Sequence, residues 1–165
     1  MRDNHWLAKQ LDFLLKTYFS NVEITNPIEI RFGREAKFRF GSIRLVKPKG
    51  LKSPRRQTRF VGSFPNRVWN RLANRDSPQK SIITITSVFA SESVPVGVVH
   101  YTIAHELCHF AHGFSSANKR LFKFPHHGGV VNRELTERGA HELIGAFKKW
   151  LKDYRKKILA GREGI

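Results

Sequence analysis

Cysteine, acidic residues and long apolar runs are all scarce in this 165-residue chain. The single cysteine, Cys108, excludes an internal disulfide framework and any zinc module built on two or four cysteines. No stretch approaches the roughly 18 consecutive apolar residues that a membrane span needs, and the first residues lack the apolar block of a signal peptide. We therefore expect a protein of a reducing compartment, cytoplasmic or associated with the nucleoid or nucleus, that is neither secreted nor bound to a membrane.

The scarcity of acidic residues gives the chain a strong positive charge. Thirty Lys and Arg residues stand against 13 Asp and Glu residues, for a formal net charge of +17. Such an excess predicts a polyanionic partner, most simply nucleic acid. Hydrophobic residues make up 40% of the chain, which is too apolar for intrinsic disorder, and the length suits one core of ordinary size. We expect a single folded domain over residues 1–165.

Three segments show the periodicity of amphipathic helices. Apolar residues recur at helical spacing over 4–19 and 95–112, and again from Val131 to Leu151. Pro95 suits a first helical turn and Gly113 suits the position just after a helix. The last segment continues into a basic end, which complements the helix dipole. The pattern predicts one long C-terminal helix there.

Strand signals lie between the first two helices. Segments 28–32 and 38–45 are rich in β-forming residues and are expected to pair as two short strands, with Gly41 at a turn or bulge. A third strand is expected over 82–86. Between them, residues 47–80 are interrupted by proline and glycine and crowded with basic residues, which predicts a loop-rich insertion.

The sequence His105-Glu106-Leu107-Cys108-His109 fits the H-E-x-x-H pattern and falls inside the predicted middle helix. Residues four apart lie on one helix face, so both imidazoles can bind one zinc ion (Zn²⁺) at roughly 2.0–2.1 Å. Glu106 lies about 100° round the helix from His105. It can therefore act as a general base toward zinc-bound water. Cys108 is expected to be buried and inert. The plainer interpretation is two ordinary histidines on a helix.

A catalytic zinc ion requires a third protein ligand, which must come from downstream. The pair His126-His127 stands in a loop, and the glycines that follow allow the backbone to approach the site closely. We favour His127, although the pattern hardly separates it from His126. The alternative is a pair of polar loop residues without a metal.

Two glutamates and one more histidine are the other candidates for the third ligand. Glu134 or Glu137 would give a set of two histidines and one glutamate, although first-turn glutamates also stabilise helix N-termini. His112 shares the helix face of His105 and His109. It lies about 10.5 Å along the axis from His105, which is too far for one tetrahedral ion.

These residues resemble the SprT-like, or Spartan, family of zinc metalloproteases. The resemblance rests on the motif at 105–109, on the later His127-Gly128 pair that opens a helix, and on the strand at 82–86 that leads into the motif helix. It spans roughly residues 28–145 as an order of elements, and it is close only around 98–129.

The resemblance implies an α+β fold, a small zincin domain of the minigluzincin kind. Such a domain has an N-terminal helix, a short and mainly antiparallel sheet, the HExxH helix and a long C-terminal helix. It also implies zinc bound by His105, His109 and His127, with Glu106 as general base. The implied activity is proteolysis of DNA-associated or DNA-crosslinked proteins, with DNA as partner and activator. The chain departs from the family in its longer loop between His109 and His127 and in lacking a cysteine-rich zinc ribbon after the domain.

Residues 36–75 contain 12 Lys or Arg and no Asp or Glu. Aromatic rings are interleaved with these cations, as in single-strand binding, where cations follow phosphates and rings stack on bases. The alternative is that the rings anchor the segment to the core and the charges are merely solvated. The candidate nucleic-acid contacts are Lys47, Lys49, Lys52, Arg55, Arg56, Arg59, Arg67, Trp69 and Arg71. Such contacts predict binding that tolerates any base sequence and weakens with salt.

Together these features predict a zinc metallopeptidase that cleaves protein substrates held near DNA, as in the repair of DNA–protein crosslinks. Two other classes remain open. One is a nucleic-acid-binding protein with a structural zinc site of four ligands. The other is a metal-dependent hydrolase of a small anionic substrate, with the basic segment lining its pocket.

Overall fold

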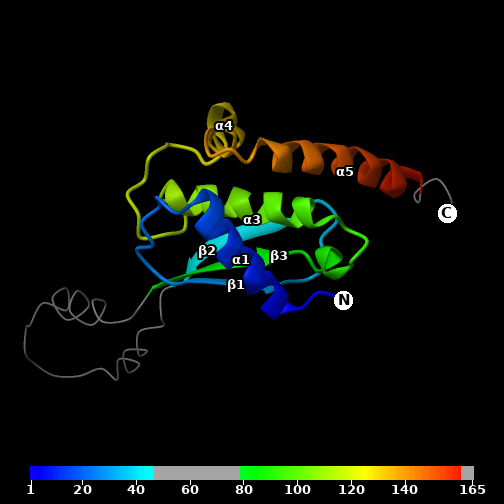
Figure 1. Ribbon diagram of the computed structural model, residues 1–165, viewed down its shortest axis with the longest axis horizontal. Helices are drawn as coiled ribbons and strands as arrows, with labels where there is room; N and C mark the ends of the chain where they lie inside the picture. The colour runs from blue at the N-terminus through cyan, green and yellow to red at the C-terminus, as the bar shows by residue number, and fades with distance from the viewer. Residues whose placement is uncertain (47–78, 161–165) are drawn as a thin grey trace, which may run out of the picture.

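The computed structural model describes residues 1–46 and 79–160 and shows an α+β arrangement of helices on a small sheet (Figure 1). In chain order the elements are α1 (Asn4–Tyr18), β1 (Ile28–Phe32), β2 (Gly41–Val46), β3 (Lys80–Ile85), the 3-10 turn η1 (Ser87–Ala90), α3 (Val96–Ala111), the 3-10 turn η2 (His127–Gly129), α4 (Val130–Glu137) and α5 (His141–Ala160). No helix in the described ranges is both long and apolar enough to cross a membrane.

Helix α1 forms where the apolar periodicity predicts it. Asp3 caps its N-terminus, since the Asp3 carboxylate accepts a hydrogen bond from the backbone N–H of Trp6 at 2.7 Å. Leu7, Leu11 and Leu14 are buried along one face, against β1 and α3. The helix therefore covers one part of the core from which the site is built.

The sheet has the strand order β1-β3-β2, so the predicted pairing of 28–32 with 38–45 is wrong. Strand β3 lies between the two, parallel to β1 and antiparallel to β2. The three-stranded sheet is therefore mixed, rather than mainly antiparallel as expected. The cause is hydrophobicity: β3 carries the buried residues Ile82, Ile83 and Ile85, whereas the outer strands carry exposed charged residues.

Helix α3 is the centre of the fold and lies between the sheet and the helices α4 and α5 (Figure 1). It agrees with the predicted helix over 95–112, with Pro95 just before its first residue. Gly113 follows it with a φ of +76°, a left-handed conformation that favours glycine and stops the helix. Val98, Val99, Ile103 and Leu107 are buried along α3. Burial of so much of its surface fixes where the histidine motif stands.

The predicted long C-terminal helix is two helices, α4 and α5. The break lies at Gly139, which has a φ of +79°. The N–H groups of Gly139 and Ala140 donate to the carbonyls of Thr136 and Leu135 at 3.0 and 2.8 Å, and so close the end of α4. Both helices pack on α3, so both carry apolar residues on the side that faces it. The apolar periodicity therefore runs on across the break and does not reveal it.

The basic insertion predicted over 47–80 lies almost wholly outside the described residues. So do all the candidate nucleic-acid contacts within it, from Lys47 to Arg71. The twelfth cation of the basic run, Arg75, lies outside as well. Of that run, the structure describes Lys37, Arg39 and Arg44, all of them exposed.

Candidate metal centre

Two histidines of the motif lie one turn apart on α3, as their spacing predicts. The ring centroids of His105 and His109 are 4.8 Å apart. His109 is buried, with 6% of its surface exposed, and His105 is half-buried. Both side chains project from the side of α3 that borders a cavity of about 450 Å³. The helix alone thus brings two imidazoles to one place.

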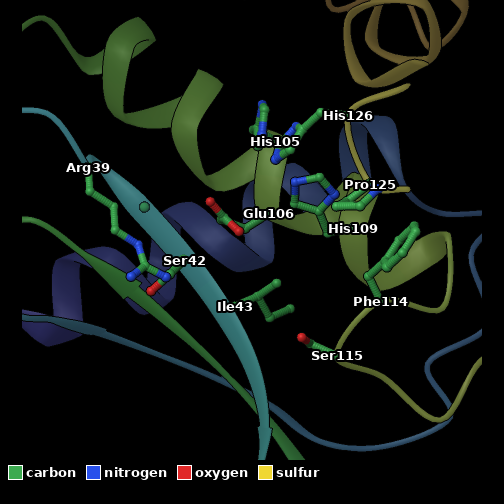
Figure 2. A pocket seen from close by; sticks show the side chains of 11 residues that line it. Arg39, Ser42, Ile43, His105, Glu106, His109, Phe114, Ser115, Pro125 and His126 are labelled. Carbon is green, nitrogen blue, oxygen red and sulfur yellow. The ribbon is translucent and has the colours of Figure 1, made fainter. Parts of the chain in front are cut away.

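The third imidazole of the group is that of His126. Its ring centroid lies 5.2 Å from that of His105 and 4.6 Å from that of His109. One ligand atom from each of the three rings lies within 4.8 Å of the others. Figure 2 shows the three rings gathered at one end of the cavity, with His126 reaching them from the loop before η2.

His127, favoured by the sequence, is not part of this group. It begins η2, where its carbonyl accepts a hydrogen bond from the N–H of Val130, and its ring lies 6.5 Å from that of Phe124. Gly128 and Gly129 both have positive φ values, +63° and +69°, and turn the chain into α4. The ring of His126 meets the histidines of α3, whereas His127 lies outside the group.

The three imidazoles are suitable ligands for a metal ion such as zinc. Burial first, and then the neighbouring histidines, lower the pKa of His105 to about 3 and that of His109 to about 4. Both rings are therefore neutral at pH 7, as metal ligands must be. Nδ1 of His109 is buried with no hydrogen-bond partner among the described residues. Nitrogens around a tetrahedral zinc ion lie about 3.4 Å apart, and the ligand atoms of the three rings lie within 4.8 Å of one another.

Two of the remaining sequence candidates, His112 and Glu134, contact each other instead of joining the histidine group. His112 is buried at the end of α3, and its Nε2 contacts the carboxylate of Glu134 on α4. Arg138 donates to the same carboxylate at 2.8 Å. Burial alone would raise the pKa of Glu134, but the hydrogen bonds from His112 and Arg138 outweigh it and lower that pKa. These side chains join α3 to α4, while Glu137 is exposed and outside the histidine group.

Cys108 is fully buried in the core, as expected for an x position of the motif. Burial raises the pKa of its thiol well above the ordinary range. The thiol therefore stays protonated, and it lies outside the histidine group.

Glu106 directs its carboxylate into the cavity between α3 and β2 (Figure 2). Only 6% of its surface is exposed. Burial raises the pKa of this carboxyl to about 7, although the charge of Arg39 and a hydrogen bond from the backbone N–H of Ile43 act in the opposite direction. A carboxyl group with a pKa near neutrality can both accept and return a proton at physiological pH.

Gly41 and Arg39 belong to this site, although no local pattern in the sequence places them there. Both line the cavity with Glu106. A Cβ atom added at Gly41 would lie 2.8 Å from Oε1 of Glu106 and 2.7 Å from Cγ2 of Thr102. Only a glycine lets β2 pass this close to α3. A contact between residues 65 positions apart leaves no local signal, and Gly41 had been expected only at a turn or bulge.

Strand β2 presents an outer edge toward the cavity. Thr86 N–H donates to the Phe40 carbonyl at 2.9 Å, and the antiparallel register continues from that pair. Because hydrogen-bonded pairs alternate along such a ladder, Gly41 and Ile43 direct their backbone groups away from β3. The hydrogen bond from Ile43 to Glu106 agrees with this direction. Within residues 1–46 and 79–160, no strand pairs with the outer edge of β2.

Comparisons with known proteins return no relative for this chain. No protein-family model matches it. Neither the curated proteins nor the solved structures contain a match.

Proposed function

We propose that this protein is a zinc-dependent metallopeptidase that acts on proteins associated with or crosslinked to nucleic acid, most simply DNA. One observation carries the proposal. The buried carboxylate of Glu106 lies beside three gathered imidazoles, in a cavity bordered by the outer edge of β2. These are the parts that hydrolysis of a peptide bond at a metal ion requires.

Each side chain has a separate role in this account. His105, His109 and His126 would hold the ion, which when bound supplies Lewis-acid polarisation of the scissile carbonyl and of water. Glu106 accepts a proton from water in the cavity and returns it to the leaving amine. Its pKa near 7 in the described structure, caused by burial, suits both directions of transfer. Arg39 adds a positive charge to the same cavity.

The outer edge of β2 favours a polypeptide as the substrate. An extended peptide can add to an exposed strand edge through main-chain hydrogen bonds, whatever its side chains are. Gly41 and Ile43 turn their backbone groups to that edge, next to Glu106. A peptide paired there would run past the carboxylate and the imidazoles.

The positive charge of the chain favours a nucleic-acid partner. A protein with such a partner is expected in the cytoplasm, the nucleoid or the nucleus. The net charge is +17, and α5, from Lys148 onward, adds a group of exposed cations to the basic run in the sequence. These cations are Lys148, Lys149, Lys152, Arg155, Lys156 and Lys157. Contacts of this kind would concentrate the enzyme on protein substrates carried by DNA, with affinity that falls as salt rises.

The test is cleavage by the zinc-loaded protein of a protein crosslinked to single- or double-stranded DNA, and of the same protein free in solution. We expect cleavage of the crosslinked form, stimulated by DNA and suppressed by high salt. Glu106→Gln should keep its zinc and lose at least about 100-fold in rate, the lower end of what general bases contribute. Glu137→Gln, an exposed glutamate away from the site, is the matched control. Full activity of Glu106→Gln would overturn the proposal.

A second candidate, a metal-dependent hydrolase of a small anionic substrate, is favoured by Arg39 alone. This exposed cation lines the cavity next to Glu106. Nucleotides or phosphate esters that are hydrolysed, while no protein is cleaved, would favour it. The structural-zinc alternative requires a fourth ligand, and the group found among the described residues offers three.

A further inference from the structure

We propose that a second cavity beside the metal centre binds an apolar side chain of the substrate, at a residue directly flanking the cleaved bond; this rests on the proposed peptidase function. The cavity has a volume of about 240 Å³. It shares Arg39, Gly41, His105 and Glu106 with the larger cavity. It therefore opens next to the carboxylate and the first imidazole of the motif.

Aromatic rings from three separate segments line this cavity. Phe40 precedes β2, Tyr101 lies on α3 and Phe147 lies on α5. The rings of Tyr101 and Phe147 are stacked with centroids 4.3 Å apart, and the edge of Phe40 meets Phe147 at 6.0 Å. Because these rings support one another, the wall is preorganised and offers a large apolar surface to a ligand.

The two hydroxyl groups of the lining, those of Tyr101 and Thr102, are already hydrogen-bonded within the protein. The hydroxyl of Tyr101 donates to Oδ1 of Asn132 at 2.9 Å. The hydroxyl of Thr102 donates to the carbonyl of Val98 at 3.0 Å. A nucleobase or sugar placed against the aromatic wall, away from Arg39, His105 and Glu106, would leave polar edges without partners, which costs free energy. An aliphatic or aromatic side chain has no such groups, so the lining favours Leu, Met or Phe.

The position of the cavity determines which residue of the substrate would bind in it. Glu106 and His105 line both cavities, so a side chain that occupies the smaller one would belong to a residue next to the reacting carbonyl. The glycine at position 41 leaves the passage between the two cavities clear, since a Cβ there would approach both Glu106 and Thr102. The enzyme should therefore select an apolar residue beside the scissile bond.

The first arm of the test measures selectivity. The zinc-loaded protein is given a set of peptides that differ only at the residues flanking one bond, and the cuts are located by mass spectrometry. We expect kcat/KM about tenfold or more higher for Leu, Met or Phe than for Ala, Lys or Asp on one side of the bond. Phe147→Trp, which fills the cavity, should reduce that preference, whereas Gly145→Ala, on the same helix with open space around it, should keep it. An unchanged preference in Phe147→Trp, or none in the wild type, would overturn the proposal.

The second arm does not depend on cleavage and so separates this proposal from the function on which it rests. N-acetyl-phenylalanine amide, N-acetyl-alanine amide and adenosine are titrated into the zinc-loaded protein, and the amide NMR signals of Gly41 and Thr102 are followed. Saturable shifts with the phenylalanine compound, absent in Phe147→Trp, support the cavity even if no peptide is cut. No shifts, or larger shifts with adenosine, contradict it.

Discussion

Gly41 of β2 lies against Glu106 of α3, so closely that a Cβ atom at position 41 would stand 2.8 Å from Oε1 and 3.3 Å from Cγ of the glutamate. The strand and the helix thus hold the carboxylate between them. The neighbouring N–H of Ile43 hydrogen-bonds the same group. The direction in which Glu106 points depends on the strand as much as on its place in the motif.

Gly41→Ala tests this relationship. The added methyl must displace the Glu106 carboxylate or Thr102, so we expect kcat to fall at least about tenfold while zinc remains bound, as 1 Å misplacements in active sites cost such factors. Activity and zinc content are measured together. Gly145→Ala is the matched control: it lies in α5 with open space around it and should raise the free energy of unfolding by roughly 0.5–1 kcal/mol. An active Gly41→Ala enzyme would show that the close approach has no role in catalysis.

The contact of His112 with Glu134 gives a pH prediction. The pKa of Glu134 lies below 4.5 in the folded protein, because hydrogen bonds from His112 and Arg138 outweigh the effect of burial. A lowered carboxyl pKa contributes stability above the unfolded value, and this contribution is lost as the pH falls through the folded value. Glu134→Gln should therefore reduce the free energy of unfolding by about 1–3 kcal/mol at pH 7.

Urea denaturation at several pH values measures this effect. The difference between wild type and Glu134→Gln should shrink as the pH falls below 4.5, because Glu134 then takes up a proton more readily in the unfolded chain than in the folded protein. Glu137→Gln, exposed on the same helix, should stay within about 0.5 kcal/mol of the wild type. A difference for Glu134→Gln that grows as the pH falls below 5 would contradict the linkage.

Local sequence patterns were enough to predict the helices and the strand that position the site. The helices 4–19 and 95–112 and the strand at 82–86 are close to α1, α3 and β3, because apolar periodicity is a local property. The spacing of His105 and His109 also determines their shared helix face. The break at Gly139 had a local signal in the glycine itself, but the apolar pattern runs on across it.

The rest depended on contacts between distant parts of the chain. The place of β3 between β1 and β2 follows from competition among strands for the most buried position, which no single strand reveals. The choice of His126 over His127 depends on how the turn at Gly128 and Gly129 meets α3. Gly41 became part of the site through its contact with a residue of another element.

We propose that His105, His109 and His126 hold one metal ion, and a comparison of His126→Ala with His127→Ala tests this assignment directly. Zinc affinity is measured by competition with a chelator of known affinity, and the ligands are identified by X-ray absorption. We predict one zinc ion with imidazole ligands in the wild type and in His127→Ala, and an affinity at least about tenfold weaker in His126→Ala, since even indirect supports of metal ligands are worth that much. Weakened binding in His127→Ala with unchanged binding in His126→Ala would contradict the assignment, and a wild-type protein that binds no zinc would contradict the metal centre itself.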